Sequence, residues 1–177
     1  MPRLRILAMT LLLSACAAAC APAGASGGFS PSGTYGPRGE AATWAATPSH
    51  ATVLAAYRRF HQVFESVLET NDPSQISSAA TGPEAARLTR LVRANRRAGV
   101  IQRSHTIPHP HVATLSAKSA EIIDCATTSG LWTYKQRSGA RVGKPPRPRR
   151  YLLYVSLTAT EGTWKVNKIT YPKDPRC

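Results

Sequence analysis

The sequence predicts an α+β fold in which two or three N-terminal helices pack on a curved antiparallel sheet of four to six strands. Apolar residues recur every three or four positions over residues 49–70 and again over 82–98, which is the period of an amphipathic helix. After Gly99 the period falls towards two, which is typical of strands. The 177 residues have room for one domain of ordinary size and a tail.

The first predicted helix begins after Ser49, a suitable N-cap, and ends at the Asn71-Asp72-Pro73 sequence. Its apolar stripe consists of Val53, Leu54, Tyr57, Phe60, Phe64, Val67 and Leu68. A short helical turn is expected within residues 73–80. The second long helix covers 82–98 and ends at Gly99. Its arginines 90, 93 and 97 gather on the face opposite Leu88 and Asn95, so we expect them to be solvated or to contact an anion.

Strands are predicted at residues 111–115, 119–127, 131–136, 150–160 and 163–171. The strand over 150–160 is apolar on nearly both faces, which favours a central position, and Glu161-Gly162 predicts a tight hairpin turn. Residues 135–150 contain five glycines and prolines, seven basic residues and no acidic one, so most of this segment is predicted to be a long, mobile loop.

The N-terminus has the features of an export signal. Arg3 and Arg5 precede a short apolar run, and Leu13-Ser14-Ala15 stands directly before Cys16. This pattern predicts a lipoprotein signal peptide over residues 1–15 and lipidation of Cys16, where two or three acyl chains such as palmitate anchor a protein stably. An ordinary secretory signal, cut near residues 17–19, remains the alternative and would give a secreted, unlipidated protein. Residues 16–47 are rich in Ala, Gly, Ser, Thr and Pro and read as a flexible tether to a domain at 48–177.

Lipidation would place the domain at the outer face of the cytoplasmic membrane, which bears on the remaining cysteines. Cys125 and Cys177 are the two in the predicted folded part, and an oxidising compartment favours their pairing in a disulfide. Cys20 lies in the tether without a partner, and would itself be the lipidated residue if cleavage shifted.

The formal net charge is +14, and without the signal peptide 21 basic residues stand against 9 acidic ones. This balance favours anionic lipid headgroups or wall polymers as partners, and export argues against nucleic acid. The candidate anion-binding residues are Arg147, Arg149, Arg150, Arg90 and Arg97. The alternative is that the 17 arginines reflect only a GC-rich genome and stay solvated.

Catalytic chemistry has few candidates. A buried carboxylate can act as a general base, and the available ones are Glu65, Glu69, Glu121 and Asp124. Strand alternation puts Asp124 on the same face as Ile122, yet we expect it to be a surface or edge carboxylate. The sequence contains no P-loop, C-x-x-C or G-x-S-x-G motif, so no catalytic residue and no cofactor is assigned.

Three histidines form an H-x3-H-x-H pattern, namely His105, His109 and His111. Neutral imidazoles bind zinc or copper, but Pro108 and Pro110 interrupt the segment and no neighbouring cysteine or carboxylate completes a ligand set. We expect surface histidines and no metal site.

Three short segments carry a resemblance to a known group of proteins. In order they are Ala-Ala-Tyr-Arg-Arg-Phe at 55–60, Glu-Ile-Ile-Asp-Cys at 121–125 and Gly-Thr-Trp-Lys-Val at 162–166. They resemble exported actinobacterial lipoproteins with a nuclear transport factor 2-like fold, a cone-shaped α+β domain, and the resemblance covers residues 49–177. It implies a recurrent cysteine pair that matches Cys125 and Cys177. The fold also includes ketosteroid isomerases and polyketide cyclases, which use an acidic residue inside the cone.

These observations favour a non-enzymatic interaction or small-ligand-binding module in the cell envelope. The alternatives are a cyclase- or isomerase-like enzyme that uses the cone cavity and a structural role through the basic surface. A cavity lined by apolar side chains favours binding, whereas an inward carboxylate with a strongly perturbed pKa favours catalysis.

Overall fold

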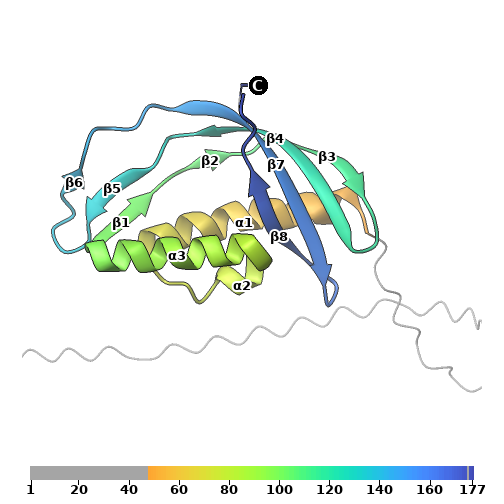
Figure 1. The fold of residues 1–177 in the computed structure, drawn as a ribbon, viewed down its shortest axis with the longest axis horizontal. Coiled ribbons are helices and arrows are strands. Elements are labelled where there is room, and N and C mark those ends of the chain that lie inside the picture. The colour runs from red at the N-terminus through yellow and green to blue at the C-terminus, as the bar shows by residue number, and fades with distance from the viewer. Residues whose placement is uncertain (1–47, 175) are drawn as a thin grey trace, which may run out of the picture. The chain divides into compact units, whose positions relative to one another are not determined.

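The computed structural model describes residues 48–174 and 176–177, and it confirms the α+β class. The three described helices are α1 (His50–Thr70), α2 (Ile76–Ala79) and α3 (Gly82–Ala98). The strands are β1 (Val100–Arg103), β2 (Thr106–Ile107), β3 (Pro110–Leu115), β4 (Ser119–Thr128), β5 (Trp132–Lys135), β6 (Arg141–Val142), β7 (Arg149–Thr160) and β8 (Thr163–Thr170). The strands arch over α1 and α3 as a curved layer (Figure 1).

The two long helices begin and end where the sequence predicts. A capping box opens α1, because Thr52 N–H donates to Ser49 Oγ at 3.2 Å and Ser49 N–H donates to Thr52 Oγ1 at 3.3 Å. Asn71 ends α1 in the left-handed region at φ 56°, and Gly99 ends α3 in the same region at φ 64°. Neither α1 nor any other described helix is long and apolar enough to cross a membrane.

The strands form two antiparallel sheets. The larger has the order β2-β4-β7-β8, with β3 paired to β4 as well, and the smaller has the order β1-β5-β6. As its two apolar faces predict, β7 lies between two other strands. Glu161 and Gly162 form the β7–β8 turn, both with positive φ.

Three short strands were not predicted, namely β1, β2 and β6. The two-residue strands β2 and β6 show too few alternations to carry a period-two pattern. The two residues of β6 lie within the basic segment that the sequence predicts to be mostly loop, and they pair with β5 at Thr133↔Val142.

The core lies between α1, α3 and the inner face of the larger sheet. Its largest fully buried apolar side chains include Tyr57, Phe60, Leu88, Ile122 and Leu157. Along β4 the even-numbered residues from 120 to 128 are buried, as the alternation predicts. Asp124 is one of them and is completely buried, so the expectation of a surface or edge carboxylate was wrong.

A disulfide joins Cys125 of β4 to Cys177, with the two Cα atoms 5.8 Å apart. Cys125 faces away from the core, because its neighbours Asp124 and Ala126 face inward. Since β7 separates β8 from β4, the tail after β8 has to pass β7 to reach this bond. Covalent closure therefore fixes the C-terminus to the outer face of the sheet.

Replacing Cys125 by Ser should lower the free energy of unfolding by about 2–4 kcal/mol, because the unfolded chain regains the entropy of an open loop. Cys177→Ser and the double variant should show the same loss, measured by urea unfolding without reductant. With reductant, wild type and double variant should coincide. Additive losses in the two single variants would show that the thiols stabilise the fold independently of the bond.

Candidate functional site

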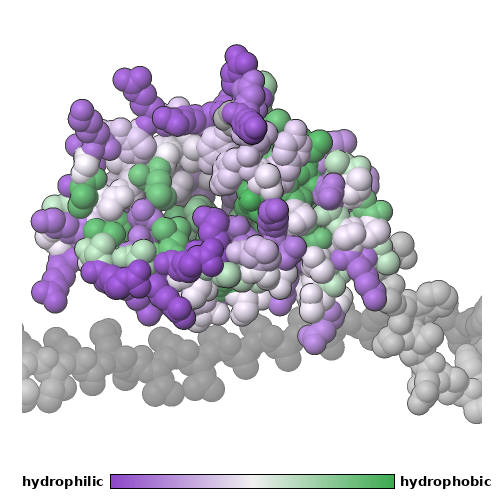
Figure 2. Space-filling view, viewed as in Figure 1, coloured by the Kyte–Doolittle hydropathy of each residue, from purple (hydrophilic) through white to green (hydrophobic). Residues whose placement is uncertain are grey.

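A cavity of about 390 Å³ opens between the helices and the inner face of the larger sheet. Its apolar lining includes residues of four elements, namely Phe60 and Phe64 of α1, Leu91 of α3, Leu153 of β7 and Ile169 of β8. Hydrophobic surface appears between the hydrophilic side chains of α3 and those of the β5–β6–β7 region (Figure 2). The cavity is the candidate functional site.

Two hydrogen bonds fix α1 beneath the sheet on either side of the cavity floor. The Tyr57 hydroxyl donates to Asp124 Oδ2 of β4 at 2.8 Å, and Glu65 Oε1 accepts from Thr106 N–H of β2 at 2.8 Å. Eight residues of helix, about 12 Å, separate Tyr57 from Glu65. The cavity residues Phe60, His61 and Phe64 lie between these two anchors. The spacing between helix and sheet is therefore fixed at both ends of the floor.

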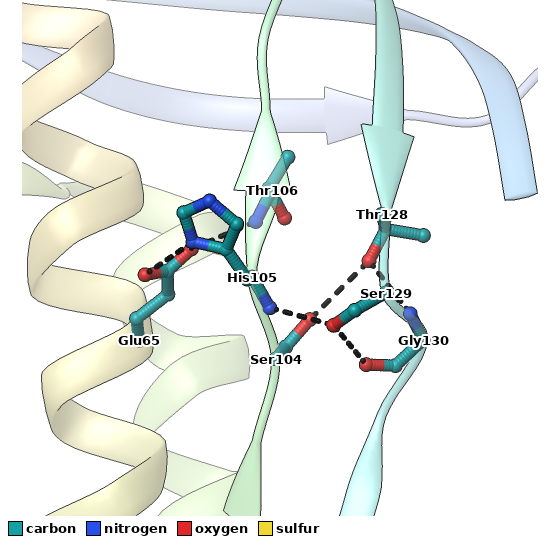
Figure 3. A network of polar contacts seen from close by, with 7 residues as sticks. All are labelled: Glu65, Ser104, His105, Thr106, Thr128, Ser129 and Gly130. Atoms are coloured by element: carbon teal, nitrogen blue, oxygen red, sulfur yellow. Dashed lines mark hydrogen bonds and ion pairs between the residues drawn. The ribbon is translucent and has the colours of Figure 1, made fainter. Parts of the chain in front are cut away.

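A kink in the paired strands forms a polar strip of the wall (Figure 3). Ser104 and His105 separate β1 from β2, and residues 129–131 separate β4 from β5, so the strand structure is interrupted at both places. His105 N–H donates to Ser129 Oγ at 3.0 Å, and Ser129 N–H donates back to the His105 carbonyl at 2.9 Å. The Ser104 and Thr128 hydroxyls lie 3.3 Å apart and both residues line the cavity. These hydroxyls offer a ligand hydrogen bonds that the apolar lining does not.

Gly130 lets the basic segment close over this end of the cavity. Its φ is +82°, and a Cβ at this position would lie 2.8 Å from Pro146 Cγ. Only glycine therefore allows the segments around residues 130 and 146 to approach this closely. This contact places Pro146 and Arg147 in the cavity lining. Part of the predicted loop is thus built into the wall instead of standing clear of the domain.

The structure separates the five arginines that the sequence singled out. Arg147 and Arg149 line the cavity. Arg150 is directed to the other face of β7, where its Nη2 lies 3.3 Å from Cys125 Sγ. Arg90 and Arg97 are exposed on α3. The five therefore do not form one anion-binding surface.

Arg87 of α3 also lines the cavity, although the sequence analysis did not single it out. Its Nε donates to Glu84 Oε2 at 3.0 Å, and its guanidinium carbon lies 5.8 Å from the centre of the Phe64 ring. Glu84 is only 2% exposed. The Arg87 charge is therefore balanced inside the protein, a pairing that the i, i+3 spacing of Glu84 and Arg87 could have indicated.

His61 is the second cavity residue that the sequence passed over. It is 8% exposed, and neither ring nitrogen has a hydrogen-bond partner among the described residues. Its ring meets those of Tyr57 and Phe60 edge-on, at centroid distances of 4.6 and 5.6 Å. Burial lowers the pKa of His61 to about 4, so the ring is neutral near pH 7.

Asp124 has the inward position that an acid–base residue would need, but its oxygens are occupied. Oδ1 accepts from His109 N–H at 2.7 Å and Oδ2 accepts from the Tyr57 hydroxyl. Burial raises the pKa of Asp124, while both hydrogen bonds act against that shift. Burial and the neighbouring carboxylate also raise the pKa of Tyr57. Asp124 does not line the cavity, and its contacts make it an anchor for α1 and for the segment that leads into β3.

The other candidate carboxylates do not converge on the cavity. Glu65 binds the backbone of β2, and Glu69 forms an ion pair with Arg103 at 2.9 Å. Glu121 is exposed on the outer face of β4.

His105, His109 and His111 are all exposed, as expected. Within the described residues there is no group of three His, Cys, Asp or Glu side chains placed to hold a metal ion. Cys16 and Cys20, with the predicted signal peptide and tether, lie outside the described residues.

No protein-family model matches the chain, and no curated protein matches its sequence. Solved structures do match its fold. The intermembrane space region of the chloroplast protein ARC6 is 11% identical, with a TM-score of 0.56 over 70% of this chain and 96% of that one. A protein of Kribbella flavida is 13% identical (TM-score 0.46, over 68% of this chain and 88% of that one). A Caulobacter vibrioides protein with a cystatin-like fold is 11% identical (TM-score 0.39, over 68% and 91%). At these identities the likeness concerns the fold alone.

The depressed pKa of His61 predicts a loss of stability in acid. The folded protein keeps this ring neutral down to about pH 4, whereas the unfolded chain takes up the proton near pH 6.5. The contribution of the neutral His61 ring to the free energy of unfolding is therefore complete above pH 6.5. About 3 kcal/mol of it is lost as the pH falls from 6.5 to 4. Relative to His61→Leu, wild type should lose this much more unfolding free energy between pH 7 and pH 4 in urea titrations. The exposed His111→Gln should follow wild type, and parallel curves for wild type and His61→Leu would contradict the assignment.

Proposed function

We propose that this protein is a lipid-anchored module of the cell envelope that binds a small ligand in the cavity and does not act as an enzyme. The cavity is the observation that supports binding. Its volume of about 390 Å³ falls within the ~300–1,000 Å³ range of ligand pockets. Its lining combines an apolar floor with a few fixed polar groups, which is the usual composition of such sites.

The state of Asp124 and His61 supports binding over catalysis. Both oxygens of Asp124 already accept hydrogen bonds, from Tyr57 of α1 and from the backbone of His109 just before β3, so abstracting a proton from a substrate would break the contact that anchors the floor. His61, with a pKa of about 4, holds a proton too weakly to be an efficient base near pH 7.

An isomerase- or cyclase-like enzyme remains the second candidate, because His61 lies in the cavity floor and neither of its ring nitrogens has a hydrogen-bond partner among the described residues. A compound that is recovered unchanged after prolonged incubation with the protein supports binding. Conversion of that compound, abolished by His61→Leu, would favour the enzyme.

The envelope location is proposed from the sequence. The basic n-region, the short apolar run and the Leu13-Ser14-Ala15-Cys16 motif together favour export and acylation at Cys16. Residues 16–47 would then hold the domain at the outer face of the membrane. Arg90 and Arg97, exposed on α3, are the residues that we propose to contact anionic headgroups or wall polymer there.

Filling the cavity with a larger side chain should weaken ligand binding. Leu91→Trp places an indole in the space from α3, so a fluorescent apolar probe that brightens on burial should bind wild type and lose at least about tenfold in affinity for the variant, or 1.4 kcal/mol. Ala94→Trp is the matched control, since it adds the same side chain at an exposed position one turn further along α3. Equal binding by wild type and Leu91→Trp would show that the probe sits elsewhere and would remove the support for a cavity ligand.

Acylation should depend on Cys16 and not on Cys20. Intact mass spectrometry of the membrane fraction should show a diacylated or triacylated N-terminal Cys16, because this residue directly follows the expected cut. Cys16→Ser should lose the lipid mass and the partition into detergent, and Cys20→Ser should keep both. The opposite result for the two variants would move the anchor to Cys20, and an unmodified soluble chain in wild type would end the lipoprotein proposal.

A further inference from the structure

We propose, building on the cavity as a binding site, that its ligand is an amphipathic anion. The ligand would consist of an apolar chain or ring system that carries one carboxylate or phosphate, with the anionic group bound by Arg147 and Arg149.

The first support is the charge of the lining. Three arginines line the cavity, and among the described residues the lining contains no acidic side chain. Arg87 is paired with the buried Glu84, but neither Arg147 nor Arg149 forms an ion pair within the described part of the chain. Both side chains are solvent-exposed, and two uncompensated guanidinium groups at the wall of an apolar cavity create a local positive potential that attracts an anion. Their planar donor sets also match carboxylate and phosphate oxygens.

The second support is that the backbone positions of both arginines are fixed by neighbouring segments. Arg149 is the first residue of β7, and its backbone pairs with that of Thr128 in β4. Thr128 also lines the cavity. Arg147 follows Pro146, which packs on Gly130 where no side chain would fit. The backbone of the site is thus in place before a ligand arrives, and only the two exposed arginine side chains have to be ordered on binding.

The third support is the chemistry of the rest of the space. Phe60, Phe64, Leu91, Leu153 and Ile169 require an apolar body. The cavity has the volume of about 13 water molecules of liquid, which accommodates one short chain or a small ring system. An apolar body with a single charged end satisfies both the floor and the two arginines.

The test uses the full mature chain with Cys16→Ser, so that no lipid competes, and three eight-carbon probes studied by calorimetry below their micelle concentrations. Octanoate and octyl phosphate carry the two candidate anionic groups, and octanol has the same chain without charge. At least one anion should bind ten times more tightly than octanol. The tighter anion identifies a fatty-acid-type or a phosphate-type ligand.

The double variant Arg147→Glu/Arg149→Glu should weaken the preferred anion at least tenfold and leave octanol within twofold. Arg150→Glu is the matched control, because it reverses the adjacent charge on the other face of β7 and should change neither probe. If the double charge reversal lowers the melting temperature, Arg147→Gln/Arg149→Gln makes the same test without adding negative charge.

Two outcomes would overturn the proposal while cavity binding stands. The first is that wild type binds octanol and the anions with equal affinity. The second is that Arg150→Glu loses as much anion binding as the double variant, which would indicate diffuse attraction to the surface. The absence of binding by all three probes together with the apolar fluorescent probe would overturn the binding function itself.

Discussion

The hydrogen bond between Tyr57 and Asp124 holds the first helix beneath the sheet, and the cavity depends on it. Both residues are completely buried, and a carboxylate in such surroundings is costly unless its oxygens are bonded. Tyr57 and the backbone of His109 meet that requirement. The result is a polar contact that has one low-energy arrangement inside an otherwise apolar core, where packing alone would tolerate small shifts of the helix. With Glu65 bound to β2 two turns further on, α1 has little freedom to settle into the cavity.

The sequence predicts the parts of this fold that are encoded locally. The ends of α1 and α3 follow from Ser49, Asn71 and Gly99, whose caps involve residues within one turn. Long strands such as β4 and β7 show enough alternation to be located within a residue or two. Strands of two residues carry no such pattern, and their pairing depends on the long strand beside them.

The candidate site was harder to predict because its contacts join distant parts of the chain. Asp124 was placed on the correct face of its strand, but its burial depends on Tyr57, 67 residues away. Nothing near Gly130 in the sequence shows that Pro146 lies against it. Net charge was equally uninformative about placement, since the consecutive residues Arg149 and Arg150 belong to opposite faces of β7. Composition predicts how much positive charge there is, and only the pleat of the strand decides which part of it meets the cavity.

The disulfide also determines what a protease can do to this domain. Residues 135–150 contain seven lysines and arginines, of which the five that no proline follows are sites for an enzyme that cuts after basic residues. The bond between Cys125 and Cys177, 52 residues apart, closes a ring that contains the whole of this segment together with β7 and β8. A single cut there leaves two fragments that stay covalently joined, with the β7–β8 hairpin still paired to β4. A nicked molecule would therefore migrate as intact until it is reduced, and it would retain most of the cavity wall.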